Sequence, residues 1–335
     1  MMSYPSKRIT VLGNGGWGTA IAVLLSEAGH AVSVWGHDES EIQAIRDAGE
    51  NKPYLKGVKL PDGITWTSQR AAVKAAELVV LAMPSKFYGA VLQSFSGVIP
   101  DACELVSVSK GFDPVTRSRL SATAETILGR ADVAALSGPS HAEEVARGIP
   151  SAVVLASRES NHAAGLQEIF NTERFRVYSS DDVTGVELGG ALKNVIAVAV
   201  GVSDGLGFGD NTRAALISRG LAEMMRLGCA LGAKPETFSG LSGLGDLVVT
   251  CTSRHSRNRS VGERLGKGET MQEIAAGMKQ VAEGVDNCDI ALCLAAEHSV
   301  EVPITQAVHN VIHGDVSPSD AVSSLMMREA KPETA

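Results

Sequence analysis

The feature that most constrains the fold is a glycine-rich turn at residues 13–18, GNGGWG, which lies between a strand-like and a helix-like segment. The apolar run ITVL ends directly before Gly13, the apolar-periodic segment TAIAVLLSEAG follows Gly18, and a second β-branched run begins near residue 31. This order predicts a strand–turn–helix–strand unit that binds a pyrophosphate group. Gly13 makes the tight turn, Gly15 lets the backbone approach the phosphates, and Gly18 allows close packing of helix on strand.

The first half of the chain repeats this alternation. Short apolar runs rich in β-branched residues occur at 9–12, 32–35, 78–82, 105–108, 133–136, 153–156 and 175–178. Helix-like segments lie between them, at 19–28, 68–76 and 120–128. Alternating strands and helices predict an α/β domain with a doubly wound, mostly parallel sheet, that is, a Rossmann-type domain over residues 1–182.

From residue 183 the pattern becomes helical throughout. Apolar-periodic segments follow one another at 186–202, 212–231, 260–265, 271–275, 285–298, 304–313 and 318–327. A length of 335 residues exceeds what one hydrophobic core usually fills. We therefore expect a second, all-helical domain over 183–335, with serine and aspartate residues near 180–184 capping its first helix.

Composition excludes several other classes of protein. A net charge of −8 and an aromatic content of 4% argue against a nucleic-acid surface. The longest uninterrupted apolar stretch in the middle of the chain, 195–202, is too short for a bilayer span, and no secretory leader is evident, so we expect no membrane insertion and a cytoplasmic location. Five cysteines without CxxC spacing indicate free thiols, and no metal site is predicted.

The end of the second predicted strand bears on the choice of cofactor. A strictly NAD-binding site usually has an acidic residue there, to bind the ribose 2′-hydroxyl. Here Gly36 and His37 occupy the strand end and Asp38 follows a little late. The sequence allows NADPH or NADH, and Asp38 turned inward would favour NADH.

Two segments of the first domain are candidates for chemistry. Lys110 follows a buried strand, at the edge where doubly wound sheets bind ligands, although a solvated lysine is the plain alternative. The segment Gly138-Pro139-Ser140 follows the next strand, where its N–H groups either meet an anion or only cap a helix.

Two segments of the second domain are candidates as well. Lys193 and Asn194 interrupt an otherwise apolar helix. The Lys193 side chain either extends along the helix to reach solvent or is buried, and a buried lysine is a candidate general acid/base. A glycine-rich loop is predicted over 240–246, ending at Asp246. Shortly after it, residues 254–259 contain three arginines. These arginines either bind a phosphate group or form a solvated basic loop.

With these segments quoted, the sequence resembles the bacterial-type NAD(P)-dependent glycerol-3-phosphate dehydrogenases from residue 9 to about 327. The resemblance rests on GNGGWGTA, VWGHD, LAMPS, SKGF, LSGPSHAEEVA, GALKNVIAVAVG, GLSGLGDLVVTCTS, SRNR and VAEG. It implies that Lys193 donates a proton and that Lys110 contacts both cofactor and substrate. It further implies cofactor contacts from Gly16, Trp17, His37, Ala142, Arg257, Val281 and Glu283, and substrate contacts from Gly138, Ser140, Asp246, Ser256, Arg257 and Asn258.

The reaction that the resemblance implies is reversible hydride transfer between dihydroxyacetone phosphate and sn-glycerol 3-phosphate, for phospholipid synthesis. Two alternatives stay open: the β-hydroxyacid and 6-phosphogluconate dehydrogenases, which share the two-domain plan and a helical lysine, and a protein that senses NAD(P)H without turnover. The sequence also leaves the oligomeric state open, and a homodimer is among the forms that it allows.

Overall fold

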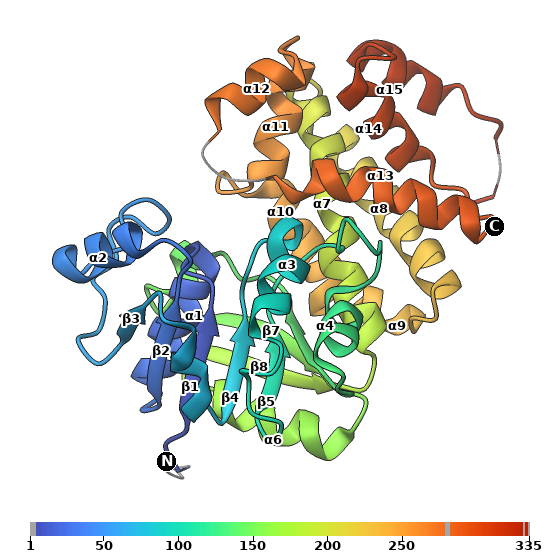
Figure 1. Ribbon diagram of the computed structural model, residues 1–335. Coiled ribbons are helices and arrows are strands. Elements are labelled where there is room, and N and C mark those ends of the chain that lie inside the picture. Colours follow the sequence, from blue (N-terminus) through green and yellow to red (C-terminus); the bar gives the residue numbers. More distant parts are fainter. Residues whose placement is uncertain (1–4, 279–281, 331, 334–335) are drawn as a thin grey trace. The chain divides into compact units, whose positions relative to one another are not determined.

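The chain divides into two compact units in a computed structural model that describes residues 5–278, 282–330 and 332–333 (Figure 1). Unit 1 comprises Met1–Glu187 and Gly240–Ser242, and unit 2 comprises Leu188–Ser239 and Gly243–Ala335. The main division thus follows residue 187, whereas the sequence predicted a boundary after residue 182. Each unit is described by itself below.

Unit 1 is built on one eight-stranded sheet. In chain order its strands are β1 (Arg8–Leu12), β2 (Ala31–Trp35), β3 (Thr65–Thr67), β4 (Leu78–Leu81), β5 (Glu104–Ser107), β6 (Ala134–Ser137), β7 (Ser151–Ala156) and β8 (Phe175–Ser180). The order across the sheet is β3-β2-β1-β4-β5-β6-β7-β8, and only the β6–β7 pair is antiparallel. The predicted doubly wound, mostly parallel sheet is confirmed.

Alternate residues of the central strands face two separate hydrophobic layers. On β4, Leu78 and Val80 join the core formed with α1 (Gly16–Glu27), α2 (Glu39–Ala48) and α6 (Ser160–Phe170). Val79 and Leu81 join the core formed with α3 (Ser85–Phe95) and α4 (Leu120–Leu128). Because successive side chains of a strand point to opposite faces, helices cover this sheet on both sides.

The strand order reverses between β1 and β4. Leu12 at the end of β1 pairs with Trp35 at the end of β2 and with Leu81 at the end of β4, so these carboxyl ends lie level. Chain connections diverge at such a point, and doubly wound sheets bind ligands in the crevice that results. The glycine-rich turn that follows β1 lies at this edge.

Unit 2 is helical. Its elements are most of α7 (Val183–Gly205), then α8 (Asp210–Ala230), α9 (Pro235–Phe238), the last three residues of a π-helical turn η2 (Leu241–Gly245), α10 (Asp246–Thr252), α11 (Arg257–Gly266), α12 (Met271–Gly277), α13 (Glu283–Glu297), α14 (Pro303–His313) and α15 (Pro318–Met326). The predicted cap of α7 is present, because the Asp182 carboxylate accepts a hydrogen bond from the Gly185 N–H at 2.8 Å. The predicted helical second domain is confirmed as a fold class.

α7 is a core helix. Its length and composition would allow it to cross a membrane, although its longest uninterrupted apolar run is short. The apolar window that makes it long enough and hydrophobic enough is, however, 100% buried in the protein. Burial of this kind is typical of the central helix of a soluble protein.

Four glycines bring the backbones of α7 and α11 into direct contact. A Cβ on Gly201 or Gly205 of α7 would lie 2.0 or 2.3 Å from the carbonyl oxygens of Arg259 and Glu263. A Cβ on Gly262 of α11 would lie 2.0 Å from the Val198 carbonyl oxygen, and Gly266 is equally crowded. Side chains keep most helix pairs 8–10 Å apart, so these glycines set an unusually close approach.

Two local predictions were wrong, and one strand was missed. The helix expected at 68–76 is a 3-10 segment, η1 (Arg70–Ala75), and strand β3 was not foreseen. The loop expected at 240–246 is helical: η2 runs directly into α10, and Asp246 is the first residue of α10. Gly243 is required there by packing rather than by a turn, because a Cβ on it would lie 2.1 Å from the Phe238 carbonyl oxygen.

Candidate active site

The glycine-rich turn has the geometry of a dinucleotide cradle. Gly13 has φ +120°, and a Cβ on it would lie 2.5 Å from the Ala82 carbonyl oxygen. A Cβ on Gly18 would lie 2.1 Å from the Gly13 carbonyl oxygen, so helix α1 packs tightly against the turn. A Cβ on Gly15, the residue before α1, would have no atom within 4 Å, so the backbone here is open to a ligand. The N–H groups of α1 that lack helical partners follow directly and suit a phosphate.

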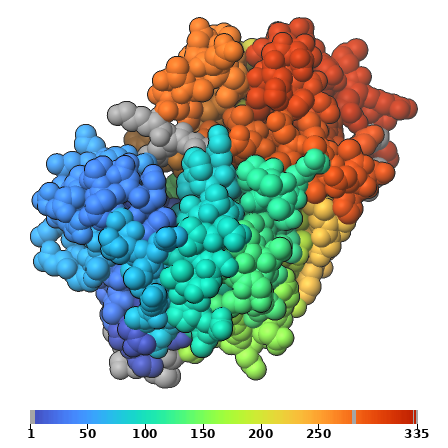
Figure 2. All heavy atoms as spheres, in the orientation of Figure 1, coloured from blue at the N-terminus to red at the C-terminus, as the bar shows by residue number. Residues whose placement is uncertain are grey.

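The end of β2 carries no inward-facing acid. Gly36 is buried and His37 is exposed. Asp38 caps α2. It accepts a hydrogen bond from the Ser40 hydroxyl at 2.6 Å and others from the N–H groups of Ser40 and Glu41 at 2.7 and 3.3 Å, and these bonds, the hydroxyl bond most of all, lower the pKa of its carboxyl. In α2 only Ile42 and Ile45 are buried. Most of this helix is therefore exposed, and it belongs to the blue surface seen in Figure 2. Asp38 is therefore engaged by its own helix.

Two predicted residues of unit 1 donate hydrogen bonds to the backbone carbonyl of a third, Gly138. Lys110 Nζ donates to the Gly138 oxygen at 3.0 Å, and Ser140 Oγ donates to the same oxygen at 2.8 Å. Gly138 has φ +142°, and a Cβ on it would lie 2.9 Å from the Val153 Cα. The turn after β6 therefore fixes the position of the Lys110 ammonium.

Trp17 connects this group to the glycine-rich turn. Its indole N–H donates to the Val108 carbonyl at 3.0 Å, two residues before Lys110. Trp17 packs against a small buried cluster, and so does Ala142, the first residue of α5 (Ala142–Val145). A Cβ on Gly16 would lie 3.8 Å from the Ala142 Cβ. The predicted residues of unit 1 thus lie around the glycine-rich turn and the turn after β6. His37 is exposed and lies just after the end of β2, the strand next to β1.

The most distinctive group in unit 2 is a buried lysine. Lys193 is 5% exposed, and its Nζ donates to Asp246 Oδ1 at 2.5 Å and to Thr250 Oγ1 at 2.8 Å. Asp246 is 1% exposed, and Thr250 donates to the Asp246 carbonyl at 2.6 Å. A buried charge needs a partner of opposite sign and further hydrogen bonds, and both are present here.

The Asn258 side chain of α11 lies between the start of α13 and the segment of α7 that carries Lys193. Asn258 is buried, and its Oδ1 accepts a hydrogen bond from the Gly284 N–H at 2.9 Å. A Cβ on Gly284 would lie 2.5 Å from the Asn194 carbonyl oxygen. Ser256 caps α11, accepting a hydrogen bond from the Arg259 N–H. The start of α11 is thereby held close to the Lys193–Asn194 segment of α7.

The three arginines at 254–259 do not act together. Arg259 is held within unit 2, at 2.8 Å from Asp204 Oδ2. Arg257 is exposed as the first residue of α11, and Arg254 is exposed just before it. Of the three, Arg254 and Arg257 are therefore the ones placed to meet a ligand from solution.

Two further predicted residues, Val281 and Glu283, belong to the segment VAEG. Glu283 is the first residue of α13 and is half-buried, whereas Val281 lies outside the described residues. Sequence reasoning missed Thr250, the second hydrogen-bond partner of Lys193. A signal was present, since Thr250 follows Asp246 by one helical turn, but it has meaning only once 246–252 is known to be helical.

A dinucleotide cradle at the switch point of a doubly wound sheet, with a buried lysine in a separate helical unit, defines the class of nicotinamide-dependent dehydrogenases. Within that class, family models described as NAD-dependent glycerol-3-phosphate dehydrogenase N-terminus and C-terminus match residues 8–163 and 182–323. The chain belongs to this family and is an oxidoreductase that uses NAD(H) or NADP(H).

Individual relatives agree with the family assignment. The chain is 48% identical to glycerol-3-phosphate dehydrogenase [NAD(P)+] of Geobacillus kaustophilus, over 98% of this chain and 96% of the relative. It is 48% identical to the enzyme of the same name from Moorella thermoacetica, over 96% of each chain. The crystal structure of glycerol-3-phosphate dehydrogenase from Coxiella burnetii superposes with a TM-score of 0.93 at 39% identity, covering 96% of this chain and 99% of that one. The resemblance stated from the sequence is confirmed.

Proposed function

We propose that this chain catalyses the reversible NAD(P)H-dependent reduction of dihydroxyacetone phosphate to sn-glycerol 3-phosphate, with Lys193 as the proton donor. The observation that carries the proposal is the buried Lys193, held by Asp246 and Thr250 in a chain that also has a dinucleotide cradle. The reaction makes a new C–H bond and a new O–H bond, and these need separate sources.

The cofactor supplies the hydride, and the residues of unit 1 bind and orient it. The turn at Gly13–Gly18 and the start of α1 receive the pyrophosphate. Gly15 fits this role, because no atom lies where its side chain would be. With Asp38 turned to its own helix, no carboxylate is directed from the end of β2 at a 2′-phosphate, so both cofactors fit.

Lys193 supplies the proton to the carbonyl oxygen as negative charge develops there. A general acid of this kind contributes about 10²–10⁴-fold to the rate. Asp246 and Thr250 hold the ammonium in one orientation, so the proton is delivered along a fixed direction. Lys110, fixed by the Gly138 carbonyl, provides a second cation for the cofactor and substrate.

The phosphate of the substrate is assigned to the start of α11. Ser256, Arg257 and Asn258 lie there in sequence, and the helix terminus attracts an anion. A guanidinium binds phosphate oxygens in pairs, so exposed Arg257 is the principal ligand. Gly138, Ser140 and Asp246 complete the substrate contacts, while Gly16, Trp17, His37, Ala142, Val281 and Glu283 complete those of the cofactor.

The product provides the backbone of glycerophospholipids, which gives the enzyme its cellular role in lipid synthesis. We place that role in the cytoplasm and propose a homodimer as the working assembly. Light scattering of the purified chain would decide the assembly, because a homodimer has twice the mass of the 34.9 kDa chain.

The test is to offer the enzyme a panel of substrates and to monitor each reaction by the loss of NADPH or NADH absorbance. Turnover with dihydroxyacetone phosphate, and little with 2-keto or 3-keto acids of similar size, is expected. Preference for a keto acid would place the enzyme with the β-hydroxyacid dehydrogenases, and cofactor binding without any turnover would indicate a sensor. Running each substrate with both cofactors also measures the cofactor preference.

A further inference from the structure

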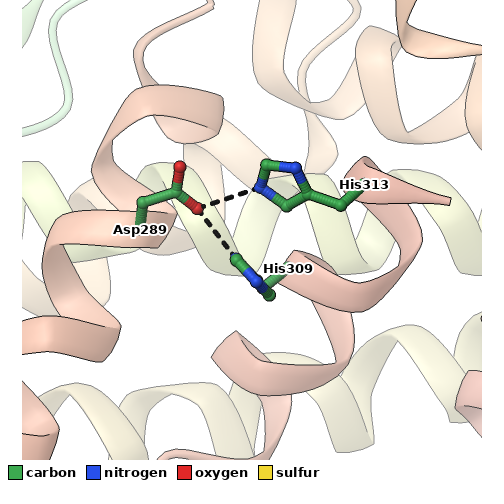
Figure 3. A group of neighbouring side chains, drawn as sticks. All are labelled: Asp289, His309 and His313. Atoms are coloured by element: carbon green, nitrogen blue, oxygen red, sulfur yellow. Dashed lines mark hydrogen bonds and ion pairs between the residues drawn. The ribbon is translucent and has the colours of Figure 1, made fainter. Parts of the chain in front are cut away.

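Two histidines and an aspartate form a compact group on α13 and α14 that the proposed reaction does not use (Figure 3). His309 Nδ1 lies 2.8 Å from Asp289 Oδ1, and His313 Nε2 lies 3.3 Å from the same oxygen. In Figure 3 the carboxylate of Asp289 points from α13 toward both imidazoles of α14. We propose that Asp289, His309 and His313 form a binding site for a divalent transition-metal ion, with Zn²⁺ as the reference ion.

The distances match those of ligands around one metal ion. The candidate ligand atoms all lie within 4.8 Å of one another. Zn–N and Zn–O bonds of about 2.0–2.2 Å place tetrahedral ligands about 3.3–3.5 Å apart. Small side-chain movements, apart for the 2.8 Å pair and together for the widest pair, therefore let the three atoms surround one ion, with water completing the coordination.

The histidine spacing and the ring positions favour a single cation. His309 and His313 are one helical turn apart, so their side chains share one face of α14. Their ring centroids lie 4.3 Å apart, which is unfavourable for two protonated imidazoles. One metal ion lets both rings stay neutral while Asp289 balances part of its charge.

The packing of the two helices holds the three ligands in place. Each ligand directly follows a buried residue, Cys288, Val308 or Ile312, so each lies at the margin of a packed face. The Cys288 thiol also donates to the Thr305 carbonyl across the two helices at 3.4 Å. His313 is the last residue of α14, where the helix dipole favours a positive charge.

The donor set indicates the kind of ion. Two imidazole nitrogens and one carboxylate oxygen suit Zn²⁺, Co²⁺, Ni²⁺ or Cu²⁺, whereas Mg²⁺ and Ca²⁺ require mostly oxygen ligands. The ligands are half-buried or exposed, so the ion enters from solution without any rearrangement of the core. Its effect is to tie α13 to α14.

Calorimetric titration of the EDTA-treated full-length chain tests the site. Zn²⁺ is expected to bind at one saturable site per chain, and Mg²⁺ is not. The double variant His309→Gln/His313→Gln is expected to lose this isotherm, while His298→Gln, which changes an exposed histidine outside the group, is expected to keep it. An unchanged isotherm in the double variant, or no saturable Zn²⁺ binding by the wild type, overturns the proposal.

Two additional measurements test whether loss of Zn²⁺ binding reflects a folding defect and whether Zn²⁺ binds to cysteine thiols instead. Asp289→Asn preserves the shape of the side chain and is expected to weaken Zn²⁺ binding and to abolish the rise in Tm that Zn²⁺ gives the wild type. The visible spectrum of the Co²⁺-loaded wild type is expected to show nitrogen and oxygen ligation only. A thiolate charge-transfer band, or an undiminished Tm rise in Asp289→Asn, contradicts the assignment. Turnover enters none of these measurements, so the site and the proposed reaction stand or fall separately.

Discussion

Lys193 is stabilised in the interior by hydrogen bonds to Asp246 and Thr250. Removing one member of a buried ion pair leaves the other charge without compensation, at a cost of about 3–5 kcal/mol. Asp246 is 1% exposed, so a Lys193 substitution affects folding as well as chemistry. Any test of Lys193 must therefore separate the two effects.

Lys193→Ala should lower kcat by about 10²–10⁴-fold and leave cofactor affinity almost unchanged, because the cradle belongs to unit 1. Steady-state kinetics and NADPH fluorescence titration measure the two quantities. The double variant Lys193→Met/Asp246→Asn removes both buried charges and is the control for stability. Turnover near the wild-type rate in Lys193→Ala would remove the lysine from the mechanism.

Arg257→Ala should cost about 2–5 kcal/mol in kcat/KM for dihydroxyacetone phosphate, since it removes a charge-assisted pair with the phosphate. Glycolaldehyde keeps the carbonyl and lacks the phosphate, so wild type and variant should reduce it at similar, very low rates. Arg254→Ala, an exposed neighbour, is the matched control and should lose less. Equal impairment of Arg257→Ala on both substrates would assign Arg257 to the chemistry or to the cofactor.

At the scale of helices, the contact between α7 and α11 determines where the proposed phosphate ligands lie. Four glycines let the two backbones touch, and the start of α11 carries Ser256, Arg257 and Asn258. Lys193 is on α7, about two to three turns before the crowded Gly201 and Gly205. Spreading the two helices would move the phosphate ligands away from the lysine.

Gly262→Ala should destabilise the protein by about 1–3 kcal/mol, because its Cβ would lie 2.0 Å from the Val198 carbonyl oxygen. Gly165→Ala is the matched control in α6, where nothing lies within 4 Å of the new Cβ. That change should stabilise the helix by about 0.5–1 kcal/mol, since alanine is the better helix former. Urea unfolding midpoints measure both, and equal shifts in the two variants would refute the close contact.

Glycine also explains which elements the sequence could predict. The β-branched runs indicated seven of the strands, because a buried parallel strand has few residue types open to it. The segment GLSGLG was interpreted as a loop, since glycine is common in turns. In the structure Gly243 is needed for contact with Phe238, and such tertiary packing leaves no local signal. Thr250 was missed as a consequence, because its spacing of one helical turn from Asp246 has meaning only once residues 246–252 are known to be helical.

At the scale of the whole molecule, burial determines which of the five cysteines can react. Desolvation raises the pKa of Cys103 to about 11 and that of Cys251 to about 12, and it also raises the pKa of Cys288. Cys229 is exposed and Cys293 is half-buried. The thiolate is the reactive form of cysteine. The three thiols with a raised pKa are therefore protected in two ways: reagents cannot reach them, and they stay protonated.

Ellman's reagent at mildly alkaline pH should therefore modify Cys229 rapidly and Cys293 slowly in the native chain. Cys103, Cys251 and Cys288 should react only after denaturation, when their pKa values return to the usual range. Cys229→Ser should abolish the fast phase alone. Fast reaction of three or more thiols in the folded protein would show that these units open more readily than their packing implies.

The length and apolar character of α7 matter before the chain has folded. As it leaves the ribosome, α7 is a 23-residue segment with a mean hydropathy of 1.4 in its most apolar window, which insertion machinery could accept as a membrane anchor. Lys193 lies close to its midpoint, where a lysine costs about 2.5–3.5 kcal/mol on insertion. A lysine at this position thus also makes membrane insertion of the segment less favourable, and replacing it with an apolar residue would remove both the proposed proton donor and this cost of insertion.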